Sequence, residues 1–411
     1  MMIQPSHSDT SALRSMERSL RSIAGAAIIA LAVFSSSSTG WALPVSNLQL
    51  SEYQKQDWQV EDGLPENNVR MIAQRPDGTL LLASSSGIAS FDGQHFRALP
   101  INDSAKAAGD SDIEAVNAIL PVGNEELWIG TDGRGVLHQT SAGTVNISER
   151  AGLYNERIRN LCKDSNGVLW IATQNGIERY TGGRLEVVKN TGMISGDLVS
   201  PFAEDGHGGM FFVTSSGLFH WQSGVARQFA LGLPNAGSPV ALYRDPPSQI
   251  WIGTTKGVVE LVQERREATA ISYHPVLRAK ISAPISVLLS DATGDLWIGT
   301  RGYGLWRLNS DGLSRWSVQN GLPDDAIRSL FIDDENNLWI GMLSGGLSRW
   351  RKGALAPYGD AEGFHATYSA NVLADSHGDL WLGTWGKGLF RRHNGKLIPT
   401  NPPNLPMTTP I

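Results

Sequence analysis

Short apolar runs recur along this chain of 411 residues at a nearly constant spacing. Six copies read Leu-Trp-Ile-Gly-Thr or a close variant, and two degenerate copies fit the same frame. Their second residues, called anchors below, stand at positions 81, 128, 170, 211, 251, 297, 339 and 381, with gaps of 47, 42, 41, 40, 46, 42 and 42 residues. This spacing matches the period of a four-stranded propeller blade, and enrichment in Trp, Ile, Val and Gly favours strands over helices.

Polar and glycine positions divide each copy into four expected strands. In six of the eight copies an aspartate stands six residues before the anchor, as Asp333 does before Trp339, and in four of these a glycine follows three residues later. Asp-x-x-Gly is typical of a tight turn, because Asp hydrogen-bonds its own backbone and Gly adopts a positive φ. A strand such as 327–332 precedes this turn and the anchor strand follows it. Two further strands, such as 304–308 and 313–318, complete a copy.

The pattern therefore predicts an all-β fold, a β-propeller of four-stranded blades with seven or eight blades. One such sheet cannot bury its apolar faces alone, but blades arranged around an axis cover one another. The segment around Trp58 resembles the segment around Trp316, so we expect the chain to begin with a fourth strand and to end near Ile398 after a third, which permits ring closure. We expect the large anchors to pack between sheets as structural residues; they are Trp128, Trp170, Phe211, Trp251, Trp297, Trp339 and Trp381.

Residues 1–42 have the pattern of an export signal. Arg14, Arg18 and Arg21 precede an apolar run of twelve residues at 23–34, and a cleavage-type sequence ends at Ala42. Twelve apolar residues are too few to span a bilayer comfortably, so we predict a cleaved signal peptide. The predicted domains are the signal peptide at 1–42, the propeller with eight repeat copies at 43–398, and a disordered tail or truncation point at 399–411.

Several elements of the repeat resemble the two-component regulator propeller repeat. The best copy contains Gly321-Leu322-Pro323, Ile327-Arg328, Asp333, Leu338-Trp339-Ile340-Gly341 and Gly345-Gly346-Leu347. The resemblance covers nearly all of residues 53–398 and is specific, because these elements recur at fixed offsets. It implies a ligand-sensing region in the periplasm, part of a receptor anchored in the inner membrane that signals through a histidine kinase or diguanylate cyclase domain.

The layout of this chain departs from that of the family. Such receptors usually carry two seven-bladed rings, a small β-sandwich and a transmembrane helix before the output domain. Here there are eight copies and no kinase or cyclase motif, so we expect a truncated product or part of a longer receptor. The chain itself is then not an enzyme, its parent carries the kinase or cyclase activity, and homodimerisation would use the missing C-terminal region. An independent eight-bladed binding protein is the other possibility.

The turns between the second and third strands supply the candidate ligand site. Arg and Lys can bind a carboxylate or sulfate, and Trp and Tyr can stack on the apolar face of a sugar. Any one of these residues could equally be an ordinary exposed turn residue. As a group on one rim they predict a site for a small molecule or oligosaccharide; the candidates are Asp132, Arg134, Lys256, Arg301, Tyr303, Trp385 and Lys387.

Charge and motif content narrow the alternatives. The formal net charge is -6, which argues against a nucleic-acid partner, because neutralising phosphates requires a basic face. The nine histidines show no metal-ligand spacing, and we predict neither metal nor cofactor. Two alternatives to a sensor remain: an exported carbohydrate-active enzyme, a lyase or glycosidase, and a scaffold that binds other proteins.

Overall fold

The computed structural model describes residues 45–46, 53–101, 115–148, 151–189, 202–245, 249–265, 271–352, 369–375, 379–384, 388–393 and 396–400. Strands dominate these residues, and two single-turn 3-10 helices, η2 (Val60–Asp62) and η4 (Val318–Asn320), lie between blades. Within the described ranges no helix is both long and apolar enough to cross a membrane. The predicted signal peptide lies outside the described residues.

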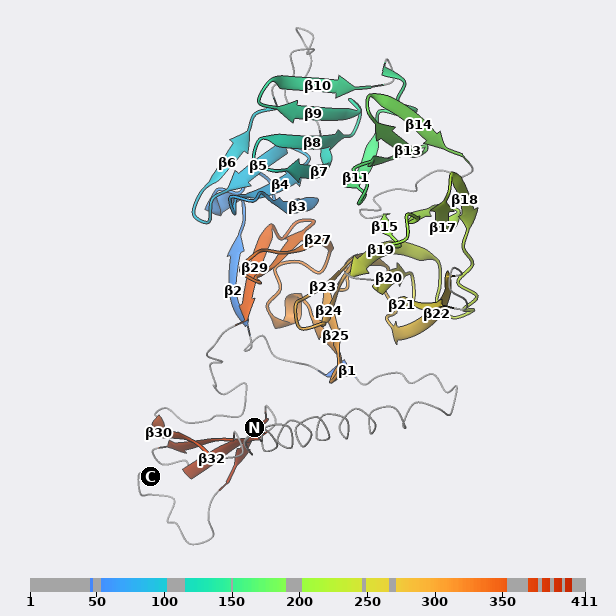
Figure 1. The fold of residues 1–411 in the computed structure, drawn as a ribbon. Coiled ribbons are helices and arrows are strands. Elements are labelled where there is room, and N and C mark those ends of the chain that lie inside the picture. The colour runs from blue at the N-terminus through green and yellow to red at the C-terminus, as the bar shows by residue number, and fades with distance from the viewer. Residues whose placement is uncertain are drawn as a thin grey trace, which may run out of the picture. The chain divides into compact units, whose positions relative to one another are not determined.

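Seven four-stranded antiparallel sheets follow one another around a ring (Figure 1). The first four are β3 (Met71–Gln74), β4 (Leu80–Ser84), β5 (Gly87–Phe91), β6 (Phe96–Leu99); β7 (Val116–Val122), β8 (Glu126–Thr131), β9 (Val136–Thr140), β10 (Gly143–Ile147); β11 (Ile158–Lys163), β12 (Leu169–Thr173), β13 (Gly176–Thr181), β14 (Arg184–Val188); and β15 (Ala203–Glu204), β16 (Met210–Thr214), β17 (Gly217–Gln222), β18 (Val225–Gln228). The next two are β19 (Pro239–Asp245), β20 (Gln249–Thr254), β21 (Gly257–Arg265), β22 (Ile271–Lys280); and β23 (Ile285–Ser290), β24 (Leu296–Thr300), β25 (Leu305–Asn309), β26 (Gly312–Trp316), with β1 (Val45–Ser46) added in parallel to β26.

The N-terminal strand completes the seventh blade and closes the ring. This blade consists of β27 (Ile327–Ile332), β28 (Leu338–Met342), β29 (Leu347–Lys352) and β2 (Tyr53–Trp58). Strand β2 pairs antiparallel with β29 along its whole length, from Tyr53 opposite Lys352 to Trp58 opposite Leu347. The ring therefore has seven blades, and the prediction that the chain begins with a fourth strand is confirmed.

The eighth repeat copy forms a separate sheet. It consists of β30 (Ser369–Ala374), β31 (Leu380–Thr384), β32 (Gly388–His393) and β33 (Lys396–Pro399), in that order. The expectation that this copy ends after a third strand is wrong, because β33 turns back and pairs with β32 as a fourth strand of its own. With β2 already paired to the seventh copy, the eighth copy is not needed to close the ring.

The eighth sheet exposes apolar side chains that the ring buries. Val372 and Leu373 on β30 are 61% and 68% exposed. Val372 stands nine residues before its anchor, and the residues at that offset are buried in all seven ring blades: Ile72, Ile119, Leu161, Phe202, Leu242, Leu288 and Leu330. The eighth copy thus has the strand pattern of a blade without the burial that a neighbouring blade provides.

The turn aspartates bind the anchor side chains as well as the turn backbone. Asp333 accepts hydrogen bonds from two turn N–H groups on Oδ1, and its Oδ2 accepts the indole N–H of Trp339 at 2.7 Å. The same bond recurs at 2.9 Å for the pairs Asp164–Trp170, Asp291–Trp297 and Asp375–Trp381. In the fourth blade, where the anchor is Phe211, Asp205 Oδ2 lies 2.9 Å from His220 Nε2 instead. One carboxylate therefore holds a turn and a large core side chain in register.

These bonds predict an acid-sensitive contribution to stability. Burial alone would raise the pKa of the Asp291 carboxyl, but hydrogen bonds from Thr293 and Trp297 outweigh it and hold that pKa below its ordinary value. A carboxyl whose pKa is depressed on folding stabilises the native state above its ordinary pKa, and loses that contribution as pH falls through the folded-state pKa. Asp291→Asn should therefore lower the free energy of unfolding near neutral pH, and by less at about pH 3.

The measurement is urea unfolding of both proteins at the two pH values. A deficit of Asp291→Asn that grows toward acid pH would contradict the assignment.

Candidate functional site

One face of the ring carries both the second turns and the starts of the first strands. We call it the entry face, and define it by the turns around Asp132, Lys256 and Arg301 together with the segments that lead into β7, β11, β23 and β27. Asp132 forms a β-bridge to Arg157, and Arg301 forms one to Ala326. Each of these turns therefore docks on the segment that enters the next blade.

Hydrogen bonds and glycines fix the backbone of the turn at Thr300–Gly304, so the Arg301 side chain projects from a defined position. The threonine that ends the anchor run caps its own turn: Thr300 donates its hydroxyl to the Gly304 carbonyl at 2.6 Å. Gly304 has φ +79°, and a Cβ there would lie 2.1 Å from the Trp316 carbonyl oxygen, so only glycine fits. The Gly302 and Gly304 N–H groups both donate to the Asp325 carbonyl, at 3.1 and 2.8 Å.

Bulges redirect one residue in five of the seven first strands of the ring. The pairing between first and second strands shifts register at residues 117, 159, 240, 286 and 328 of the ring. A β-bulge leaves its extra residue outside the ladder and re-aims its side chain. These positions stand eleven residues before their anchors, and Arg70 occupies the same offset in the first copy; the set is Arg70, Asn117, Arg159, Val240, Ser286 and Arg328.

Several of these residues bond across blade boundaries. Arg70 donates to the Asn117 side chain, and the Asn117 amide in turn donates to the Ile158 carbonyl at 2.8 Å. The Ser286 hydroxyl donates to the Ile327 carbonyl at 2.6 Å. Neighbouring first strands are thus joined by side chains as well as by packing, so a ligand that moves one of these residues also acts on the next blade.

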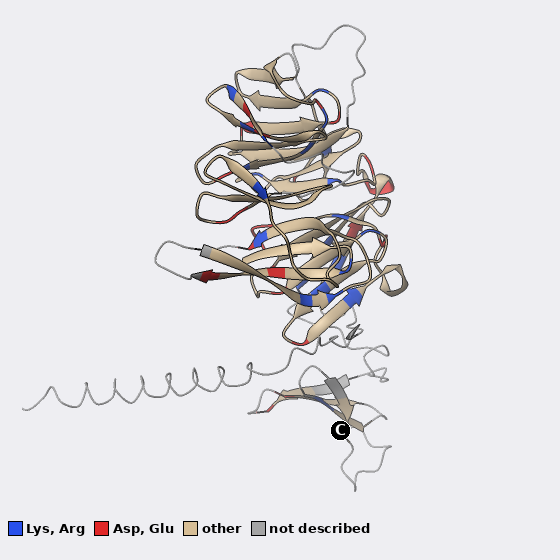
Figure 2. Cartoon of the chain, turned by 90° about the vertical axis from the view of Figure 1, so that its right-hand side faces the viewer, with Lys and Arg blue, Asp and Glu red and all other residues tan. Residues whose placement is uncertain are grey.

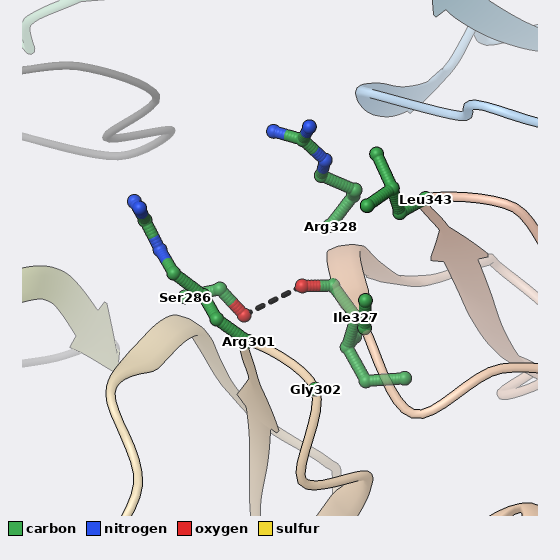
Figure 3. A pocket seen from close by; sticks show the side chains of 7 residues that line it. Ser286, Arg301, Gly302, Ile327, Arg328 and Leu343 are labelled. Atoms are coloured by element: carbon green, nitrogen blue, oxygen red, sulfur yellow. Dashed lines mark hydrogen bonds between the residues drawn. The ribbon is translucent and has the colours of Figure 1, made fainter.

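A pocket of about 350 Å³ opens on the entry face between the sixth and seventh blades. Its described lining residues are Ser286, Arg301, Gly302, Ala326, Ile327, Arg328 and Leu343. Figure 3 shows the Arg301 and Arg328 side chains extending to the same side, with Leu343 beside Arg328. Arg301 is exposed and Arg328 is half-buried, whereas Ser286 is only 4% exposed. The pocket therefore combines two guanidinium groups with an apolar wall.

Carboxylates near these turns are bound to backbone N–H groups. Asp324 accepts from the Ser344 N–H at 2.8 Å and the Ala326 N–H at 3.0 Å. In the first blade Glu66 accepts from Ser85 and Ser86, and these bonds outweigh burial to hold its pKa below the ordinary value. In the view of Figure 2 acidic and basic residues are interspersed over the strands and turns of the ring. The charge of any one site therefore depends on the residues that line it, not on the net charge of the chain.

The structure brings together only some of the predicted rim residues. Arg301 lines the pocket, and Tyr303 is 48% exposed in the same turn without lining it. Asp132 and Arg134 belong to the second blade, and Lys256 belongs to the fifth. The Asp132 carboxylate lies 3.5 Å from the Arg159 guanidinium. Trp385 and Lys387 lie outside the described residues. Of the anchors, Trp251 and Trp381 are half-buried, and the others are buried.

Sequence reasoning missed Ser286, Arg328 and Leu343 as pocket residues. A signal for Arg328 was present, because Arg70, Arg159 and Arg328 recur eleven residues before their anchors. Nothing comparable marks Ser286 or Leu343, which reach the pocket only because two blades pack side by side.

Comparison with known families identifies the repeat. The family model described as two component regulator propeller matches residues 153–175 and 321–344. These segments enter the third and seventh blades, and the second of them contains Arg328 and Leu343. Two segments of the chain are therefore similar to the two component regulator propeller repeat. No curated protein sequence matches the chain.

Solved structures support the propeller fold. The extracellular domain of the putative hybrid two component system BT3049 from B. thetaiotaomicron has a TM-score of 0.62 at 21% identity, covering 84% of this chain and 49% of that one. That of BT4673 from the same organism has a TM-score of 0.57 at 19% identity, covering 86% and 48%. Virginiamycin B lyase from Staphylococcus aureus has a TM-score of 0.55 at 14% identity, covering 73% and 99%. The chain spans about half the length of the two extracellular domains, and identities this low establish the fold alone.

Proposed function

We propose that this chain, built from two component regulator propeller repeats, is the ligand-sensing module of an exported membrane receptor. The observation that carries the proposal is the family match at 321–344, which includes the seventh-blade side of the Arg301–Arg328 pocket. The module would work in the periplasm, and its parent would be anchored in the inner membrane. A histidine kinase or diguanylate cyclase domain would supply the output.

The position of the pocket suggests how binding could be transmitted. Its two arginines come from different blades, and the seventh blade also holds the N-terminal strand β2. A ligand that contacts both blades would favour the ring arrangement in which Arg301 and Arg328 are best placed to meet it. It can shift that equilibrium only by its difference in affinity for the two arrangements. The shift would pass to the output domain through the dimer of the parent receptor.

Two alternative functions lead to different experimental outcomes. A carbohydrate-active enzyme would cleave an oligosaccharide that it binds, and a scaffold would bind a protein without binding a small ligand. Similarity to virginiamycin B lyase does not favour the enzyme, because one fold hosts many unrelated functions.

The test is a thermal-stability screen of the purified chain against neutral and acidic oligosaccharides, followed by mass spectrometry of the recovered ligand. A sensor module should be stabilised by a subset of them, since a ligand that binds only the native state raises the unfolding temperature. It should return that ligand unchanged. Recovery of cleaved products would favour the enzyme. Absence of any stabilisation across the screen would count against ligand sensing.

A further inference from the structure

We propose that the pocket between the sixth and seventh blades binds an acidic group, a carboxylate or sulfate ester, carried on a compact body with an apolar face such as one sugar ring. This inference rests on the proposed function, because it names the ligand class of the same site. It is carried by the charge, wall chemistry and size of the pocket.

Charge is the first argument. Arg301 comes from the turn after β24, and Arg328 from the bulge of β27, so two guanidinium groups approach one cavity from two blades (Figure 3). A guanidinium presents paired N–H donors that match the two oxygens of a carboxylate or sulfate.

The wall chemistry is the second argument. Ala326, Ile327 and Leu343 line the pocket beside the arginines, and Leu343 is 39% exposed although it is a large aliphatic residue. The buried Ser286 hydroxyl already donates to the Ile327 carbonyl. The described lining therefore offers charge and an apolar surface, and it suits an acid with an apolar face better than a ligand read through many hydroxyl groups.

Size is the third argument. Small-molecule sites in proteins span about 300–1,000 Å³, and the volume of about 350 Å³ places this pocket at the small end of that range. It can take one acidic unit of a longer chain, or a small acid by itself. The rest of an oligosaccharide would lie outside it on the entry face.

The experiment titrates the full chain with four probes: glucuronate, glucose 6-sulfate, glucose and inorganic sulfate. Ligand-observed NMR with probe concentrations up to about 10 mM can measure a dissociation constant of about 1 mM. We expect both sugar acids to bind, with affinity that falls as salt screens the charges, and glucose to bind at least about tenfold more weakly. No binding of either sugar acid, or equal binding of glucose, would overturn the proposal.

Variants then locate the site. Arg301→Gln and Arg328→Gln should each weaken binding of the sugar acids about tenfold or more, because each removes a charged donor. Leu343→Ala should weaken the sugar acids and leave inorganic sulfate unchanged. Arg97→Gln, on the outer strand β6 with its side chain 73% exposed, is the matched control and should change nothing. Thermal unfolding of each variant verifies that it folds.

Full retention of binding by the double variant Arg301→Gln/Arg328→Gln would overturn the assignment to this pocket. If neutral oligosaccharides stabilise the chain and neither acid binds, the ligand class is wrong and the sensing role stands. If acids bind at the pocket and are recovered as cleaved products, the ligand class stands and the sensing role fails.

Discussion

Removing the N-terminal strand β2 is expected to abolish cooperative folding of the ring, whereas removing the eighth sheet should leave the ring folded. Strand β2 is the outer strand of the seventh blade, and all six of its residues are paired with β29. Its two aromatic residues pack in two core clusters, Trp58 between the seventh and first blades and Tyr53 between the sixth and seventh. Trp58 stacks on Trp339 at a centroid distance of 5.5 Å, and Tyr53 lies 5.7 Å from Trp297 and from Trp350.

The expected magnitude follows from these contacts. Truncating one buried aromatic side chain costs about 3–5 kcal/mol, and β2 supplies two aromatics together with a full ladder of hydrogen bonds. A typical domain is stable by only about 5–15 kcal/mol, so the loss is comparable with the whole stability. The bare β29 would also present an unpaired edge, which favours aggregation.

The measurement compares urea unfolding of three chains: 43–411 as reference, 63–411 without β1 and β2, and 43–352 without the eighth sheet. Chain 63–411 should show no cooperative transition or should aggregate, and chain 43–352 should keep the reference midpoint. An unchanged midpoint for 63–411 would contradict a ring closed by β2. A large drop for 43–352 would show that the eighth sheet supports the ring.

The individual blade could be predicted from sequence because its signals are local. The period of the anchors, the Asp turn and the apolar first strand all lie within about forty residues, and each follows from the chemistry of a few side chains. The similarity between Trp58 and Trp316 even indicated the role of the N-terminal strand. Register within each sheet follows from the same repeat, since the anchor strand always pairs with the strand before it.

The number of blades and the composition of the site could not be predicted, because both depend on packing between copies. Eight equivalent repeats are visible in the sequence, and only the pairing of β2 with β29 shows that seven close the ring. The pocket likewise joins Ser286 and Arg301 of one copy to Arg328 and Leu343 of the next. The bulge that re-aims Arg328 is a feature of the backbone ladder, so the recurring arginine was visible in the sequence while its direction was not.

The two anchors Trp339 and Trp381 separate the contribution of the ring from that of the single sheet. Their local surroundings match: each donates its indole N–H to a turn aspartate, at 2.7 and 2.9 Å, and each lies under an arginine, at 5.6 and 5.3 Å from the ring centroid. Among the described residues, the ring adds two aromatic contacts around Trp339: Trp58 from the closing strand β2 of its own blade, and Phe91 from the first blade. A difference between the two anchors therefore measures what ring closure by β2 and packing against the first blade add to the stability of one repeat.

Trp339→Ala should lower the free energy of unfolding of the ring by about 3–5 kcal/mol, because it empties a fully packed site and leaves the Asp333 carboxylate without its indole donor. Trp381→Ala should leave the main unfolding transition unchanged, because its side chain is half-buried in a sheet that pairs with no strand of the ring among the described residues. Urea unfolding followed by circular dichroism measures both, because the midpoint and slope of the transition give the free energy of unfolding whatever the amplitude of the signal. Equal losses for the two variants would mean that the aspartate–indole bond, rather than the contact between blades, makes these anchors important. A large loss for Trp339→Ala alone would show that the repeat gains most of its stability only when its copies stand side by side in the ring.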